Sequence, residues 1–180
     1  MKEISLHILD IMQNSVTAGA NLIELAVTED EKNDILSFSV KDNGKGMSEE
    51  LLESVTDPFT TGRTTRKVGL GIPLLKHAAE LTGGGISIKS KLGEGTLIVA
   101  EFVHSSIDRQ PLGNMSETMH QLIISFEGVD FIYSHKVNDK EFLVDTREFK
   151  KILGGVSFKE NEVSLWILEY LKEGEAELYN

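Results

Sequence analysis

The chain has 180 residues, a formal net charge of −11 at pH 7 and no cysteine. This length suits one ordinary domain with a small addition. The negative charge argues against the phosphate attraction that dominates nucleic-acid binding, and the lack of cysteine excludes disulfides and thiolate catalysis. No apolar run approaches the roughly 20 residues that span a bilayer, and the polar N-terminus is unlike a secretory signal. We therefore expect a cytoplasmic protein with no membrane or nucleic-acid partner.

Residues 4–16 have the periodicity of an amphipathic helix, with apolar side chains on one side and polar side chains on the other. Asp10 and Asn14 are four residues apart, so they lie one turn apart on the polar side, with His7 one turn before them. Ser15 falls on the apolar side. Taken alone, this arrangement is more typical of a solvated helix face than of a site.

Two strands are predicted next, over residues 22–28 and 35–41, joined by a short turn. Asp42 continues the alternation of apolar side chains in the second strand, so it points inward, where a carboxylate requires a hydrogen-bond partner. Gly44 and Gly46 follow, and they let the backbone turn sharply and approach a flat group closely. The alternative is an aspartate that only starts a turn.

The segment from residue 58 to residue 79 is positively charged in an otherwise acidic chain. It contains Arg63, Arg66, Lys67 and Lys76 and no acidic residue. The guanidinium forks, hydroxyls and free N–H groups of such a segment are suited to a triphosphate. A solvated loop rich in threonine and glycine is the alternative, but it does not explain why the charges are segregated.

Gly69 and Gly71 precede a predicted helix over residues 72–79, whose N-terminus is a favourable place for an anion. The segment matches neither the Walker phosphate loop nor the dinucleotide fingerprint. Two more strands are predicted over residues 86–89 and 96–102, and Thr96 shares the inward phase of the second.

Four motifs in this order resemble the GHKL family of nucleotide-binding proteins: residues 13–20 (QNSVTAGA), 42–47 (DNGKGM), 69–71 (GLG) and 93–96 (GEGT). The family includes histidine kinases, anti-sigma-factor serine kinases, MutL mismatch-repair ATPases, gyrase-type topoisomerases and heat-shock chaperone ATPases. The resemblance covers residues 1–105. It implies an α+β fold of the Bergerat type, a two-layer α/β sandwich with a mixed sheet, helices on one face and a mobile ATP lid over residues 56–71.

The resemblance implies that Asn14 coordinates Mg²⁺ between the protein and the triphosphate, in the all-oxygen site that this ion prefers. It places Asp10 where ATPase members of the family hold the glutamate that orients the attacking water. It also implies that Asp42 accepts a hydrogen bond from the adenine amino group and that Thr96 supports Asp42. The remaining ATP-binding residues that it implies are Gly44, Gly46, Met47, Thr60, Thr61, Arg63, Arg66, Lys67, Gly69, Leu70 and Gly71.

These motifs do not separate the branches of the family. Residues 14–20 are closest to MutL-type and chaperone ATPases, whereas residues 57–71 and 93–96 are more similar to sensor kinases. Thr17 departs from both patterns, because histidine kinases usually carry a basic residue there and ATPase members an aspartate. Asp10 is one methylene shorter than glutamate, and positioning errors of about 1 Å can lower a rate about 10²-fold.

Residues 106–180 are predicted to form a small α+β domain in which we recognise no family motif, and residues 104–114 read as a linker. The expected elements are strands over residues 122–126, 131–136 and 141–144, and helices over residues 115–121, 146–153 and 161–173. Ser116 is the expected cap of the first helix, and we interpret Trp166, Phe158 and Tyr170 as core residues. This domain could dock a partner, form a dimer or cap the open side of the nucleotide domain.

Two classes of function remain open from the sequence. The first is a stand-alone histidine-kinase-like or anti-sigma-factor-like signalling module that transfers the γ-phosphate of Mg·ATP to a partner protein. The kinase-like lid and the single nucleotide domain favour it. The second is a slow MutL-like ATPase that acts as a conformational switch, which residues 14–20 and Asp10 favour. A nucleotide-sensing adaptor without catalysis is a third. We expect ATP, Mg²⁺ and an unidentified protein as partners, with a homodimer as a further alternative.

Overall fold

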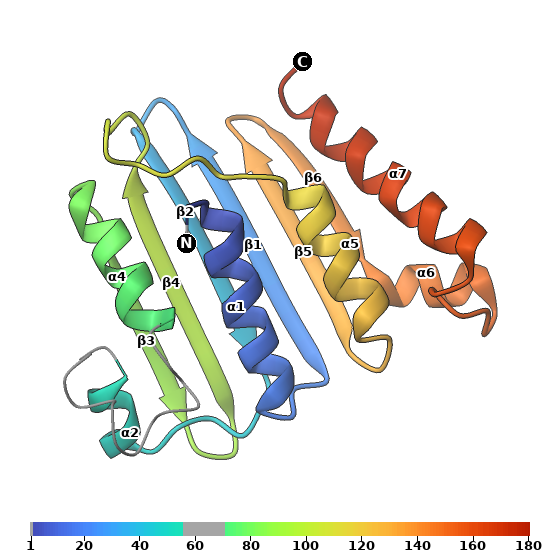
Figure 1. The fold of residues 1–180 in the computed structure, drawn as a ribbon, viewed down its shortest axis with the longest axis horizontal. Helices are drawn as coiled ribbons and strands as arrows, with labels where there is room; N and C mark the ends of the chain where they lie inside the picture. Colours follow the sequence, from blue (N-terminus) through green and yellow to red (C-terminus); the bar gives the residue numbers. More distant parts are fainter. Residues whose placement is uncertain (1, 56–70) are drawn as a thin grey trace.

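The computed structural model describes residues 2–55 and 71–180, which form an α+β fold around one six-stranded mixed sheet. The strand order is β3-β4-β2-β1-β5-β6 (Figure 1). All neighbours are antiparallel except β1 and β5, which run parallel. The strands are β1 (Leu22–Asp30), β2 (Ile35–Asp42), β3 (Gly85–Lys91), β4 (Gly95–Val103), β5 (Asp130–Val137) and β6 (Lys140–Asp145).

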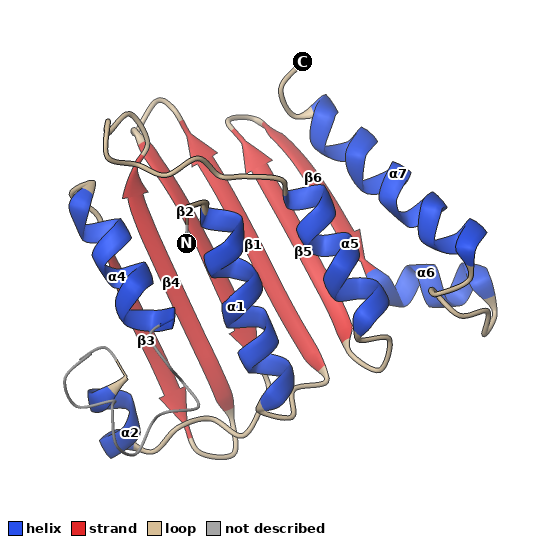
Figure 2. Ribbon diagram, in the orientation of Figure 1, coloured by secondary structure: helices blue, strands red, loops and turns tan. Residues whose placement is uncertain are grey.

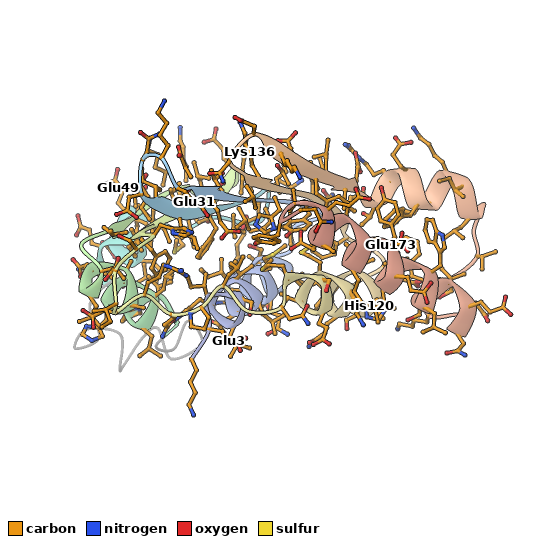
Figure 3. The ribbon with its side chains drawn as sticks, turned by 90° about the horizontal axis from the view of Figure 1, so that it is seen from above. Glu3, Glu31, Glu49, His120, Lys136 and Glu173 are labelled. Carbon is orange, nitrogen blue, oxygen red and sulfur yellow. The ribbon has the colours of Figure 1, made fainter. Side chains whose placement is uncertain are left out.

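The helices α1, α4 and α5 cover one face of this sheet (Figures 1 and 2), and the view along its edge in Figure 3 places them all on the same side. Helix α7 packs on α5 beyond the β6 edge. The helices are α1 (Ile4–Thr17), α2 (Glu49–Ser54), α4 (Gly71–Leu81), α5 (Met115–Ser125), α6 (Thr146–Leu153) and α7 (Asn161–Glu177). This arrangement confirms the expected sheet with helices on one face.

The core lies between the sheet and these helices, and the alternation read from the sequence determines its composition. In β2, Leu36, Phe38 and Val40 are buried, whereas the residues between them are only partly covered. They meet the apolar side of α1, where Ile8 and Met12 have no exposed surface. The burial of apolar surface, which stabilises a fold by about 25 cal/mol per Å², is the main contribution that holds these two layers together.

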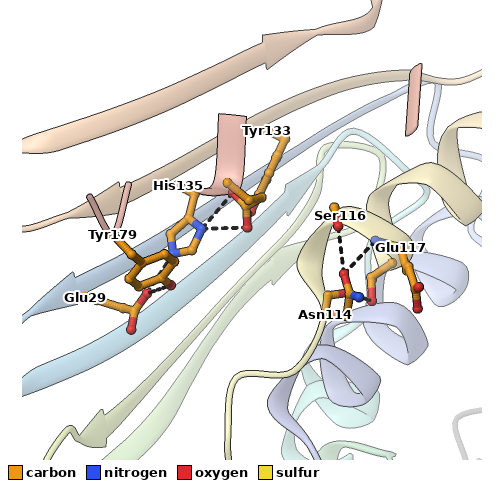
Figure 4. A network of polar contacts seen from close by, with 9 residues as sticks. Glu29, Asn114, Ser116, Glu117, Tyr133, His135 and Tyr179 are labelled. Atoms are coloured by element: carbon orange, nitrogen blue, oxygen red, sulfur yellow. Dashed lines mark hydrogen bonds and ion pairs between the residues drawn. The ribbon is translucent and has the colours of Figure 1, made fainter. Parts of the chain in front are cut away.

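One predicted element in the second half of the chain is wrong. Residues 122–126 were expected to form a strand, but Leu122 and Ile123 lie in the last turns of α5 and are buried there. They continue the helical spacing of Met119, so the helix places all three side chains in the core. The helix is capped by Asn114 instead of Ser116, because the Asn114 side chain accepts a hydrogen bond from the Glu117 backbone (Figure 4).

Residues beyond 105 extend the sheet that the first half of the chain begins. Strand β5 pairs with β1 from Leu22 opposite Asp130 to Glu29 opposite Val137. The segment before α5 also contacts the start of α1, because the amides of Ile4 and Ser5 donate to the carbonyls of residues 111 and 112. Strand β5 therefore covers the β1 edge of the sheet. The division of the chain at residue 105 and the role of residues 106–180 stay predictions.

A buried histidine joins the C-terminal helix to the sheet (Figure 4). His135 has no exposed surface, its Nδ1 lies 2.9 Å from both carboxylate oxygens of Glu175, and its Nε2 lies 2.9 Å from Glu29. The hydroxyls of Tyr133 and Tyr179 donate to Glu175 and Glu29. Burial opposes the charged imidazole, but the hydrogen bonds to Glu175 and Glu29 outweigh it and raise the pKa of His135 to about 9.

We expect this cluster to make stability depend on pH on the alkaline side. The folded pKa lies above the ordinary value of 6.5, so the stabilisation is fully present below pH 6.5 and is lost as the pH rises through about 9. Relative to Glu175→Gln, the native chain should lose about 2 kcal/mol of unfolding free energy across that range. Urea unfolding followed by circular dichroism at several pH values measures this. Glu173→Gln, an exposed position on the same helix, is the control, and equal pH slopes in all three proteins would contradict the assignment.

Candidate functional site

The end of β2 is tied to helix α1 by the Asp42 carboxylate. Its Oδ2 accepts a hydrogen bond from the Ser15 hydroxyl at 2.5 Å, and its Oδ1 accepts one from the Gly44 amide at 2.9 Å. Ser15 is a buried residue of α1, so its hydroxyl approaches Asp42 from the helix side of the sheet. Asp42 therefore points inward, as the strand phase predicts, and it has the partners that an inward carboxylate requires.

Thr96 lies beside Asp42 in the sheet, since the two are paired across β2 and β4. Its hydroxyl lies 2.8 Å from the Ser90 hydroxyl, which donates to the Gly95 carbonyl and accepts from the Met47 amide at 2.8 Å. Ser90 therefore connects Thr96 to the glycine-rich turn that follows β2. Sequence reasoning missed this serine, although its inward phase with Ile88 was a usable signal.

The turn over residues 42–47 is fixed by close backbone contacts that only glycine permits. Gly46 has φ +71°, and a Cβ there would lie 2.1 Å from the carbonyl oxygen of Lys91. A Cβ on Gly95 would lie 2.0 Å from the carbonyl oxygen of Asp42. Within this turn, the Lys45 amide donates to the carbonyl of Ala18, and the carbonyl of Lys45 accepts from the Gly93 amide. The motifs at 42–47 and 93–96 thus form one packed corner.

A substitution at this corner tests the close packing. Gly46→Ala should lower the free energy of unfolding by about 1–3 kcal/mol, because the left-handed backbone and the Lys91 carbonyl both oppose a methyl group. Gly85→Ala is the matched control, since no atom lies within 4 Å of its added Cβ. Urea titration of the two variants measures the difference, and equal stabilities would show that the corner relaxes freely.

Helix α1 also contacts the start of α4 through Asp10. A Cβ on Gly71, the first residue of α4, would lie 2.1 Å from Oδ2 of Asp10, so the carboxylate rests against this glycine. Burial raises the pKa of Asp10, and the nearby His7 acts in the opposite direction. Asn14 is exposed on the same polar side, one turn further along the helix. Of the predicted site residues, Asp10 and Asn14 therefore share the polar side of α1, and Gly71 lies against Asp10.

His7 belongs to the interior instead of the site. It is buried, and its Nε2 lies 3.0 Å from the side-chain oxygen of Gln110. Burial lowers the pKa of His7, although the hydrogen bond to Gln110 acts in the opposite direction. Burial therefore favours the neutral ring.

The lid residues Thr60, Thr61, Arg63, Arg66, Lys67, Gly69 and Leu70 lie outside the described part of the chain. In the part that is described, no three histidine or acidic side chains are placed to hold a metal ion. The donor available at Asn14 is a neutral amide oxygen. This donor fits Mg²⁺ only if phosphate oxygens and water complete its octahedral shell.

Comparison with known proteins gives the family. The description "Histidine kinase-, DNA gyrase B-, and HSP90-like ATPase" matches residues 2–106. The chain belongs to this family. No helix in the described ranges is long and apolar enough to cross a membrane.

Relatives of the chain include much longer sensor kinases. It is 28% identical over 108 residues to "Putative sensor histidine kinase NtrY-like" of Rickettsia conorii, covering 60% of this chain and 18% of that protein. It is 41% identical over 83 residues to "Sensor protein SrrB" of Staphylococcus aureus, covering 42% of this chain and 14% of that protein. The chain thus spans less than a fifth of the length of either relative.

Solved structures extend the likeness of fold beyond the family match. The N-terminal domain of a DNA repair protein superposes with a TM-score of 0.56 at 15% identity, covering 81% of this chain and 53% of that one. The Aquifex aeolicus MutL ATPase domain complexed with ADP superposes with a TM-score of 0.50 at 13% identity, covering 86% and 70%. Each covers more of this chain than the family match does, so the similarity of fold reaches beyond residue 106.

Proposed function

We propose that the chain is a regulatory module that binds Mg·ATP at the corner between α1, the end of β2 and the start of α4. The observation that carries this proposal is the Asp42 carboxylate, held by Ser15 and Gly44 in a corner that admits only glycine at residues 46 and 95. Membership in an ATPase family supports the choice of nucleotide.

The recognition of adenine would depend on the lone pairs that Asp42 has left. Ser15 and Gly44 each donate one hydrogen bond to this carboxylate, and an ionised carboxylate has about four acceptor positions. The amino group of adenine can fill one of them. The exposed Asn14 amide oxygen would bind the magnesium ion that accompanies the phosphates, and the lid residues and Gly71 would lie along those phosphates.

Calorimetric titration with ATP separates these two roles. Asp42→Asn should weaken nucleotide binding about tenfold or more with and without magnesium, because the new amide group places a donor near the donors of Ser15 and Gly44. Asn14→Ala should weaken binding only when magnesium is present. Asn33→Ala, an exposed asparagine in the β1–β2 turn, is the control. Unchanged affinity in both site variants would contradict the site.

For the reaction, phosphoryl transfer to a partner protein is our leading proposal. The sensor kinases among the relatives support it, and the positive charge of residues 58–79 suits the stabilisation of a transferring phosphoryl group. The acceptor side chain would come from the partner. The one structural observation that favours a slow ATPase instead is the partly buried Asp10 beside the start of α4, which could orient a water molecule.

Phosphate release from Mg·ATP by the purified protein distinguishes the two reactions. A slow ATPase should show turnover that falls about 10²-fold or more in Asp10→Asn while ATP affinity is retained. A kinase that awaits its partner should bind ATP tightly and release little phosphate, and Asp10→Asn should change little. Turnover that persists unchanged in Asp10→Asn would exclude Asp10 as the base.

A further inference from the structure

Large apolar side chains are exposed on α6, on α7 and in the loop between them. Ile152 is 72% exposed, Leu165 is 53% exposed and Trp166 is 41% exposed, and Val156 and Tyr170 are exposed as well. These elements meet at the β6 end of the molecule (Figure 1). This finding corrects the interpretation of Trp166 and Tyr170 as core residues, whereas Phe158 is buried as predicted. We call these five residues, together with the charged residues between 145 and 173, the α6–α7 surface.

The aromatic side chains of this surface pack against a buried ring of α6. The ring of Trp166 lies 5.4 Å from that of the buried Phe149 and 5.6 Å from that of Tyr170. Tyr170 also contacts Phe149, at 5.5 Å between ring centres. Tryptophan and tyrosine side chains are enriched near the centres of protein interfaces.

The charges of the α6–α7 surface differ from those of the rest of the chain. Residues 145–173 contain five basic and six acidic residues, although the whole chain has a net charge of −11. On α6 and in the following loop, the basic residues Arg147, Lys150, Lys151 and Lys159 outnumber the acidic residues Glu148 and Glu160, although Arg147 and Lys150 already pair with Asp145 and Asp130. On α7, Glu162, Glu169 and Glu173 outnumber Lys172. One half of the surface therefore has a small net positive charge and the other half a net negative charge.

A surface of this kind is complementary to itself. In a two-fold symmetric contact, α6 of one copy meets α7 of the other, so each basic half faces an acidic half. The present pair between Lys151 and Glu148 is exposed on both sides, and such pairs contribute little, so Lys151 is available to a new partner. A uniformly acidic or basic partner would leave like charges facing each other in one half.

We propose that the α6–α7 surface forms a two-fold symmetric dimer with the same surface of a second copy of this chain. Approach through this nearly neutral surface brings the two acidic chains together where their repulsion is smallest. It also leaves the corner at α1 and α4 open, because α4 and α6 lie at opposite ends of the sheet (Figure 1). This proposal is independent of the function proposed above.

Molar mass and tryptophan emission provide the first test, and Trp166 is the only tryptophan in the chain. Light scattering after gel filtration should give a mass that rises with concentration from 19.9 kDa towards twice that value. Over the same concentrations, the emission of Trp166 should shift to shorter wavelength as the ring is covered. Leu165→Glu should weaken dimerisation about tenfold or more. Ile107→Glu, at a fully exposed position before α5, should leave it unchanged.

A pair of charge-reversed proteins tests the symmetry. The first carries Lys151→Glu and Lys159→Glu, and the second carries Glu162→Lys and Glu169→Lys. Each should be monomeric alone, because both halves of its surface then have the same sign, and an equal mixture should dimerise again. Circular dichroism confirms that each variant is folded. A native chain that stays monomeric at sub-millimolar concentration, or a dimer that these changes do not affect, would overturn the proposal.

Discussion

The hydrogen bond from Ser15 to Asp42 is the contact on which the geometry of the glycine-rich corner depends. It fixes the end of β2 against helix α1, and the Gly44 amide fixes the same carboxylate from the turn that follows. Helix α1 in turn places Asp10 against the first residue of α4. Helix α1 therefore sets the distance between the Asp42 carboxylate, which we propose binds adenine, and the N-terminus of α4, which we propose lies along the phosphates. A shift of α1 along its axis would disturb both ends of the site together.

The first half of the fold could be predicted from local patterns because its elements are defined by short periods. Alternation along β2 gave the inward phase of Asp42, and the glycines at 44 and 46 indicated a turn that the close contact of Gly46 with Lys91 now explains. Ser15 and Ser90 were not singled out. Each is a small polar residue in an apolar phase, and its role is visible only when residues distant in sequence come together.

The second half was less predictable for two different physical reasons. Residues 122–126 are an apolar run that is too short for its period to distinguish strand from helix, and only the packing of α5 on the core decides. The His135 cluster joins groups from β1, β5 and α7, and Glu29 and Glu175 lie far from His135 in the sequence. A histidine in a strand with no acidic residue next to it in sequence gives no sign that it will be held between two carboxylates.

The parallel pairing of β1 with β5 has a consequence for how the chain folds. Leu22 pairs with Asp130, which lies far along the chain. The backbone amides at the start of α1 donate to carbonyls of residues 111 and 112. Closing so long a loop is entropically costly, and such non-local contacts slow folding. During synthesis, the β1 edge of the sheet would stay unpaired until most of the chain has emerged. An exposed strand edge of this kind invites pairing with other chains, so the later segment protects the earlier one from aggregation.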